Sequence, residues 1–124
     1  MSSSIVSIWR VKQIDMTIGH SVSLIGGLPG EYVEFTDDGY YRVDIKDKRP
    51  GVSRFKTARS SGWSELDIWI EGLEALVKQC IYRIDGDLLT ICVAGNSAER
   101  PTEFRRDDQL FWCIILMERE KLNR

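Results

Sequence analysis

One stretch of the chain decides its fold class: Cys80-Ile81-Tyr82-Arg83-Ile84-Asp85-Gly86-Asp87-Leu88-Leu89-Thr90-Ile91-Cys92-Val93-Ala94. An Asp-Gly pair between two runs rich in apolar residues is a strong short-range signal for a β-hairpin. We therefore expect antiparallel strands over residues 77–84 and 87–94. Cys80 and Cys92 flank the turn at nearly equal distances. We expect them to lie almost opposite each other across the hairpin, as small buried residues.

Apolar and polar residues alternate with a period of two on both sides of this hairpin. A second hairpin is predicted where two alternating runs flank a turn, namely Val33 and Phe35, then Asp37-Asp38-Gly39, then Tyr41 and Val43. Further strands are expected at residues 8–14, 52–58, 65–71 and 109–118, with a short strand at 99–104 and a helical turn within 73–79. About eight strands at short, regular spacing predict an all-β, antiparallel up-and-down barrel.

Length, charge and cysteine content narrow the class of protein. The chain has 124 residues, which suits one domain over residues 1–124, and its net charge of −2 gives no overall attraction to nucleic acid or to an acidic membrane. Three cysteines without a CxxC spacing favour a reducing compartment over a disulfide framework. No apolar run is long enough to span a membrane, and the first residues lack the pattern of a secretion signal. We therefore expect a cytoplasmic protein with no nucleic-acid or membrane partner.

Residues 80–104 also carry a specific combination of motifs. The turn Asp85-Gly86-Asp87 is followed by Ile91-Cys92-Val93-Ala94 and then by Glu99-Arg100-Pro101-Thr102-Glu103-Phe104. Together with Trp9-Arg10-Val11 and residues 34–41, these motifs resemble the signature of a small lipocalin-like domain family of bacteria, abundant in planctomycetes. The resemblance extends over most of the chain. It implies a calycin-type barrel, in agreement with the strand count, and it implies no particular activity.

Trp9, Arg100 and Glu103 form a candidate cluster at one end of the barrel. The resemblance to lipocalin-like folds implies that Arg100 stacks on Trp9 and pairs with a carboxylate, which closes the barrel. The alternative is a site at the barrel end for an anion or a small polar ligand.

The candidate ligand site is the barrel interior. An eight-stranded barrel is wide enough to hold one small ligand or to be filled by its own side chains. The inward residues expected to line it are Val33, Phe35, Tyr41, Val43, Phe55, Leu66, Ile68, Leu89 and Ile91. They suit a small apolar or amphipathic molecule, and the loops at residues 15–30 and 46–51 would set its selectivity.

The last predicted strand is apolar on both faces. Leu110, Trp112, Ile114 and Leu116 alternate there with Phe111, Cys113, Ile115 and Met117. A strand on a barrel exterior normally has one polar face, so we expect a cover: a segment of this chain, a second copy or another protein. We favour a protein–protein surface that includes Trp69, Phe111, Trp112, Ile115 and Met117. A basic stretch over residues 42–59 either attracts an acidic partner or forms a solvated outer face.

Catalysis and cofactors are disfavoured. His20 is the only histidine, so it would have to be the base of a nucleophile or the axial ligand of a haem, and a solvated loop position is the simpler interpretation. We expect no enzyme activity, no metal and no cofactor. Two hypotheses remain. One is a non-catalytic lipocalin-like binding protein; the other is a filled barrel that acts as a protein–protein interaction module, as a homodimer or as an inhibitor or immunity-type partner.

Overall fold

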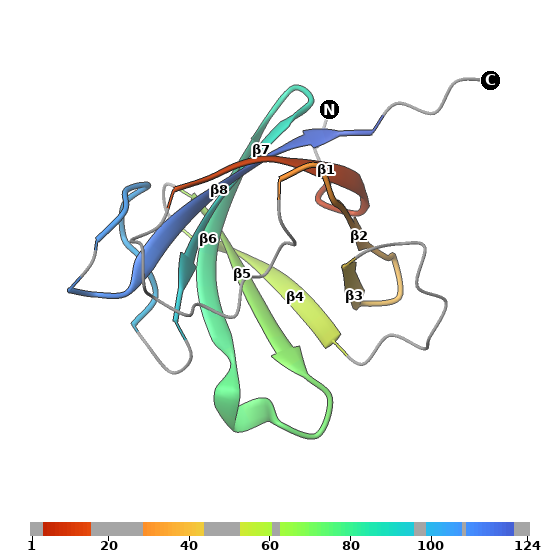
Figure 1. Ribbon diagram of the computed structural model, residues 1–124. Helices are drawn as coiled ribbons and strands as arrows, with labels where there is room; N and C mark the ends of the chain where they lie inside the picture. The colour runs from red at the N-terminus through yellow and green to blue at the C-terminus, as the bar shows by residue number, and fades with distance from the viewer. Residues whose placement is uncertain are drawn as a thin grey trace.

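The structure, a computed structural model, describes residues 4–15, 29–43, 53–60, 63–95, 99–107 and 109–120, without the side chains of Val43, Ser60 and Leu76. Within these residues, eight strands form one closed antiparallel barrel, in which consecutive strands pair and β8 returns to β1 (Figure 1). The strands are β1 (Ser7–Asp15), β2 (Tyr32–Phe35), β3 (Tyr40–Val43), β4 (Ser53–Ser60), β5 (Trp63–Ile70), β6 (Lys78–Asp85), β7 (Leu88–Ala94) and β8 (Trp112–Arg119). The predicted all-β, up-and-down barrel is confirmed.

The hairpin predicted from residues 80–94 forms as β6 and β7. Asp85 pairs with Leu88, which leaves a two-residue turn between them. Gly86 in this turn has a φ of 62°, a conformation that glycine adopts without the steric cost of a Cβ. The expected helical turn is present as η1 (Glu74–Leu76), a 3-10 turn before β6.

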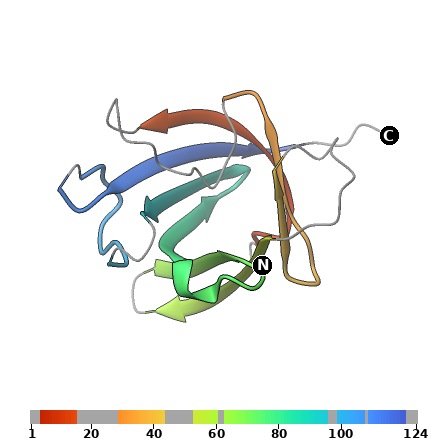
Figure 2. The same cartoon turned by 60° about the horizontal axis from the view of Figure 1, so that its bottom comes forward.

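The two ends of the barrel differ in their connections. The β2–β3, β4–β5 and β6–β7 turns lie at one end, which we call the short-turn end. The β1–β2, β3–β4, β5–β6 and β7–β8 connections lie at the other, which we call the long-loop end. In Figure 1 the β6–β7 turn is at the top and the β5–β6 connection at the bottom, and Figure 2 brings this bottom forward and shows the strands around a common interior. The loops predicted to set selectivity therefore leave from the long-loop end, while most of their residues lie outside the described ones.

The barrel interior contains a large apolar core, which we call the inner cluster. Its buried members are Ile5, Trp9, Val11, Val33, Phe35, Tyr41, Phe55, Leu66, Ile68, Cys80, Leu89, Ile91, Val93, Cys113, Ile115 and Met117. At the short-turn end, the indole Nε1 of Trp9 donates a hydrogen bond to the carbonyl of Ile5 at 2.9 Å. Arg119 stacks on the same indole, with its guanidinium carbon 4.4 Å from the ring centroid. Aromatic and apolar packing thus closes this end.

A second apolar group, the outer cluster, lies on the opposite face of the sheet. It consists of Ile81, Cys92, Ala94 and Trp112, with Trp63, Phe104 and Ile114 packed against it. Residues 99–107, which we call the strap, cross over this cluster. The indole Nε1 of Trp112 donates to the carbonyl of Glu99 at 3.2 Å, and the guanidinium carbon of Arg105 lies 5.1 Å from the centroid of the Trp112 indole.

The strand expected at 99–104 is wrong, because the strap is irregular and contributes to the sheet only an isolated bridge between Asp107 and Trp112. Pro101 is the third residue of the strap and has no N–H with which to join a strand ladder. The strap is therefore held by this one bridge and by side-chain contacts with the sheet, rather than by a strand ladder.

Candidate functional site

The residues predicted to line the barrel interior are neighbours in space. Eight of the nine belong to the inner cluster: Val33, Phe35, Tyr41, Phe55, Leu66, Ile68, Leu89 and Ile91. The ninth, Val43, pairs with Val33 across β2 and β3, and its side chain lies outside the described part of the chain. The ring centroid of Phe35 lies 4.9 Å from that of Tyr41 and 4.9 Å from that of Phe55. The alternation of residues thus identified the inner wall of the barrel.

Tyr41 brings a polar group into this apolar interior. Its side chain is 4% exposed, and its hydroxyl has no hydrogen-bond partner among the described residues. Burial raises the pKa of this hydroxyl well above its ordinary value, and interaction with the Cys80 thiol raises it further. A buried hydroxyl that makes no hydrogen bond costs roughly 1–3 kcal/mol. A ligand that accepts a hydrogen bond here would recover that free energy.

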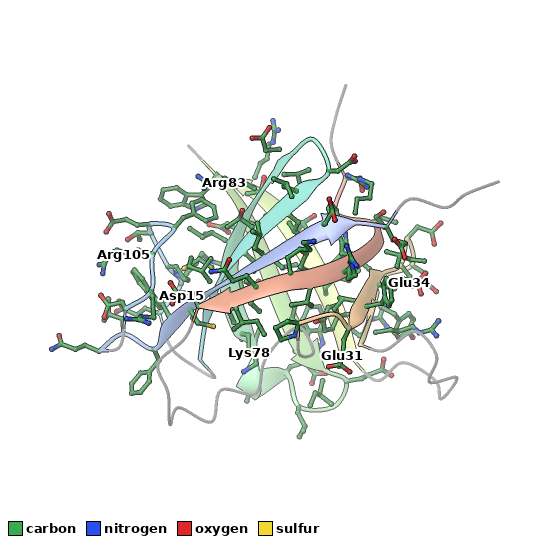
Figure 3. All side chains as sticks on the ribbon, turned by 45° about the horizontal axis from the view of Figure 1, so that its top comes forward. Asp15, Glu31, Glu34, Lys78, Arg83 and Arg105 are labelled. Carbon is green, nitrogen blue, oxygen red and sulfur yellow. The ribbon has the colours of Figure 1, made fainter. Side chains whose placement is uncertain are left out.

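Lys78 places a cation at the long-loop end of the same interior. It is the first residue of β6, pairs with the buried Ile68 of β5, and is only 9% exposed. Figure 3 shows it at the lower edge of the barrel. Burial lowers the pKa of its ammonium, whereas interactions with the Cys80 and Cys113 thiols raise it. Both thiols belong to the inner cluster. Lys78 thus lies at the long-loop end of the β6 face that also carries Cys80.

The cysteines are poor nucleophiles. All three are buried and free of disulfides. Burial raises the pKa of Cys80 far above its ordinary value and raises those of Cys92 and Cys113 to about 11. Because the thiolate is the reactive form, these thiols are mostly protonated and unreactive at neutral pH.

The expectation that Cys80 and Cys92 lie almost opposite each other is wrong. Cys80 pairs with Val93, and Cys92 pairs with Ile81. This offset of one residue sends the two thiols to opposite faces of the sheet. Cys80 lies inside the barrel, and Cys92 lies under the strap with its Sγ 3.4 Å from the carbonyl oxygen of Arg105.

The structure does not bring Trp9, Arg100 and Glu103 together as expected. Arg119 of β8, not Arg100, stacks on Trp9. Glu103 instead forms an exposed ion pair with Arg105, at 3.0 Å. The predicted closing cluster is therefore corrected: the barrel end is closed by Ile5, Trp9 and Arg119.

Arg100 anchors the strap on the outside of the barrel. Its Nη2 lies 2.7 Å from Oδ1 of Asp67 on β5, and its Nη1 donates to the carbonyl of Cys80 on β6 at 2.8 Å. Glu65 lies 3.7 Å from its Nε. Arg100 thus has the carboxylate partner that was expected, but on the outer face of two neighbouring strands.

Most of the proposed protein–protein surface is not available for contact. Ile115 and Met117 are fully buried in the inner cluster, so their assignment to an interface is wrong. Trp112 is buried beneath the strap. Phe111, which precedes β8 with a positive φ of 60°, stays 55% exposed, and Trp69 is half-buried. The cover expected on the last strand is thus supplied by the chain's own segment.

Two of the four described basic residues in the stretch 42–59 contact neighbouring groups, and the other two, Lys56 and Arg59, are exposed. Arg42 pairs with Glu34 at 3.5 Å. Arg54 lies over the ring of Tyr40, 4.5 Å from its centroid, and 3.6 Å from the carboxylate of Glu71. Residues 44–52 of this stretch, like His20, lie outside the described residues.

An acidic groove lies on the outside of β1 and β2. Its volume is about 560 Å³, and its lining residues are Val6, Ser7, Ile8, Glu34, Phe35, Thr36, Asp37, Asp38 and Glu120. Within the described ranges, no group of three or more His, Cys, Asp or Glu side chains is placed to hold a metal ion.

Sequence reasoning missed Lys78 as a site residue. The signal was available, because Lys78, Cys80, Tyr82 and Ile84 alternate along β6 and share its inward face. A lysine at the first inward position of a strand brings at least its aliphatic stem to the edge of the apolar core.

Comparison with models of protein families, with curated proteins and with solved structures finds no match to this chain. Over the described ranges, no helix has both the length and the hydrophobicity needed to cross a membrane. The resemblance to a lipocalin-like family stays a prediction.

Proposed function

We propose that this protein is a non-catalytic, lipocalin-like binding protein that holds a small apolar or amphipathic molecule inside its barrel. The observation that carries the proposal is the hydroxyl of Tyr41, which is buried in the inner cluster and lacks a hydrogen-bond partner in the described part of the chain. Buried polar groups in proteins are nearly always satisfied. A bound molecule that accepts a hydrogen bond explains this group.

The architecture of the barrel supports the same function. Trp9 and Arg119 close the short-turn end, so the long-loop end is the route by which a molecule would enter. The two loops predicted to set selectivity also leave from that end. Ligand sites in β-barrels typically lie at the barrel mouth, with apolar walls and a few polar groups.

The alternative, a protein–protein interaction module, has lost most of its supporting surface. The residues that suggested it on β8 point into the barrel or lie beneath the strap. A bacterial origin and a cytoplasmic location remain part of the proposal and rest on the sequence pattern alone.

The test is native mass spectrometry of freshly purified protein, with the denatured mass of the same sample as reference. We expect a folded monomer with added mass that disappears on denaturation. The ligand-depleted protein should then take up N-phenyl-1-naphthylamine, a neutral apolar fluorophore, with a rise in fluorescence. Absence of both added mass and fluorophore uptake in the folded protein would overturn the proposal.

A matched pair of variants locates the site. Val93 is fully buried and pairs with Cys80 and Cys113 near the long-loop end, so Val93→Phe should weaken fluorophore uptake about tenfold by filling the interior. Leu88 lies on the same strand but is exposed, so Leu88→Phe should leave uptake unchanged. Circular dichroism checks folding, and Ile68→Phe on β5 repeats the test from another wall. If the folded interior variants Val93→Phe and Ile68→Phe take up the fluorophore as well as Leu88→Phe does, the ligand site lies elsewhere.

A further inference from the structure

We infer that the molecule held in the barrel is a neutral carbonyl compound with a hydrocarbon body, such as a ketone or an ester, whose oxygen accepts a hydrogen bond from the hydroxyl of Tyr41. This inference rests on the proposed function and names the class of ligand for the same site. Three features of the described interior lead to it: one buried hydroxyl without a partner, apolar walls around it, and the lack of a free charged group beside it.

Tyr41 brings its hydroxyl into the inner cluster in a fixed position. It lies on β3, pairs with Phe35 of β2, and its side chain is 4% exposed. The centroid of its ring lies 4.9 Å from that of Phe35, which packs edge-on against Phe55 at 4.9 Å. The ring is thus held among other rings, and the hydroxyl at its end makes no hydrogen bond within the described part of the chain.

Water is a poor partner for this hydroxyl. A buried water molecule needs about two to four polar partners, and apolar cavities stay dry. Within the described inner cluster, the indole of Trp9 and the thiol of Cys80 each donate to a backbone carbonyl already. The remaining thiol, that of Cys113, is only a weak hydrogen-bonding group. A ligand atom that brings its own hydrocarbon body satisfies the hydroxyl better than water does.

The same surroundings favour an uncharged ligand. Lys78 is the one charged side chain among the described buried residues, and it already interacts with another group. An ionised head group beside Tyr41 would therefore be buried without a free counter-charge. Burial of an isolated charge costs far more than one hydrogen bond returns.

A carbonyl oxygen suits this site better than a hydroxyl or an amide. The tyrosine hydroxyl donates one hydrogen bond, and a ketone or ester oxygen accepts it without adding a donor. An alcohol or a primary amide would add an O–H or N–H group, which needs an acceptor of its own. Among the described side chains of the inner cluster, the oxygen of Tyr41 is the one such acceptor apart from sulfur. The hydrocarbon body gains from burial against the remaining apolar walls.

The test compares three probes that share an octyl chain. They are 2-decanone, 2-methyl-1-decene, in which a CH2 group replaces the ketone oxygen, and nonanoate, in which a charged oxygen replaces the methyl group of the ketone. Their affinities are measured at neutral pH by displacement of N-phenyl-1-naphthylamine from ligand-depleted protein. Wild type should bind 2-decanone at least about tenfold more tightly than nonanoate. Tyr41→Phe should weaken 2-decanone about fivefold, as expected for one neutral hydrogen bond, and leave 2-methyl-1-decene within about twofold.

Tyr40→Phe is the matched control, because it removes a hydroxyl from the neighbouring residue of the same strand. Tyr40 lies on the opposite face of the sheet, where Nη1 of Arg54 donates to its hydroxyl at 3.4 Å. This variant should bind all three probes as wild type does. The infrared C=O stretch of bound 2-decanone should lie at a lower wavenumber in wild type and in Tyr40→Phe than in Tyr41→Phe, because a hydrogen bond weakens the C=O bond.

The stability of the ligand-depleted protein gives an independent readout. Since the hydroxyl of Tyr41 makes no hydrogen bond to the described residues, its removal should not lower Tm. A clear loss of Tm in ligand-depleted Tyr41→Phe would show that the hydroxyl serves the fold, and would overturn the inference. Circular dichroism establishes that each variant is folded.

The binding outcomes separate this inference from the proposed function. If wild type binds nonanoate as tightly as 2-decanone, or if Tyr41→Phe affects the ketone and the alkene equally, the head-group assignment is overturned and barrel binding is left intact. The same holds if the fluorophore binds and none of the three probes displaces it. If folded wild type takes up no fluorophore and carries no added mass, the proposed function and the inference both fail.

Discussion

The anchoring of the strap by Arg100 makes a quantitative prediction about stability. Arg100 makes two charge-assisted hydrogen bonds, to the carboxylate of Asp67 at 2.7 Å and to the carbonyl of Cys80 at 2.8 Å. The side chains of Arg100 and Asp67 are 20% and 16% exposed, so water replaces these bonds only in part. Hydrogen bonds to charged groups contribute roughly 1.5–3 kcal/mol each. Taking the lower value for each bond, Arg100→Met should reduce the free energy of unfolding by about 3 kcal/mol.

The assay is urea denaturation followed by circular dichroism, supported by thermal unfolding. A loss of this size should lower Tm by about 10 °C for a chain of this length. Lys12→Met is the control, because the exposed pair between Lys12 and Glu118 should contribute less than about 0.5 kcal/mol. A double-mutant cycle of Arg100→Met with Asp67→Asn should give a coupling energy of about 1–2 kcal/mol.

Two results would refute this reasoning. One is a folded Arg100→Met protein that loses less than about 1 kcal/mol, since that is below the contribution of a single charged hydrogen bond. The other is strict additivity of Arg100→Met and Asp67→Asn, because residues in contact should couple. Either would mean that the strap is held by its contacts with Trp112 rather than by Arg100.

Three further predictions follow from the buried groups. Trp112→Ala should lower the free energy of unfolding by about 3–5 kcal/mol and leave the oligomeric state unchanged by light scattering, whereas a change of molar mass in a folded variant would restore the interface hypothesis. Burial lowers the pKa of Lys78 below its ordinary 10.5, so the unfolded state binds more protons just below that pH, and wild-type stability should rise relative to Lys78→Met as the pH approaches 10.5 in urea titrations; a constant difference would contradict the burial of its charge. Cys80, Cys92 and Cys113 should react with a thiol reagent only as fast as the protein opens, because each is buried with a raised pKa; rapid labelling of native protein would contradict this.

The alternation of residues determined the barrel and most of its inner wall. The pairs Phe35 with Tyr41 and Leu89 with Ile84 form across hairpins that the sequence predicts locally. In a strand the side-chain period of two is a backbone property, so an apolar alternation identifies the inward face before any long-range contact is known.

The same pattern could not determine which walls of the barrel face each other. Tyr41 on β3 was predicted as an inward residue and Lys78 on β6 was not, and the placement of these two strands depends on closure of the barrel. The alternation along a strand predicts whether a side chain points into the barrel. It does not predict which side chains of other strands that side chain contacts. The polar character of the interior therefore emerged only from the closed structure.

The strap shows the boundary between sequence and tertiary structure most clearly. The sequence by itself determined that the last strand is apolar on both faces and needs a cover. Only the tertiary structure decided that residues 99–107 supply it, through an ion pair between Arg100 and Asp67, which are 33 positions apart in the chain. Local periodicity arises from the backbone of neighbouring residues, whereas a contact at this separation is selected by the packing of the whole chain.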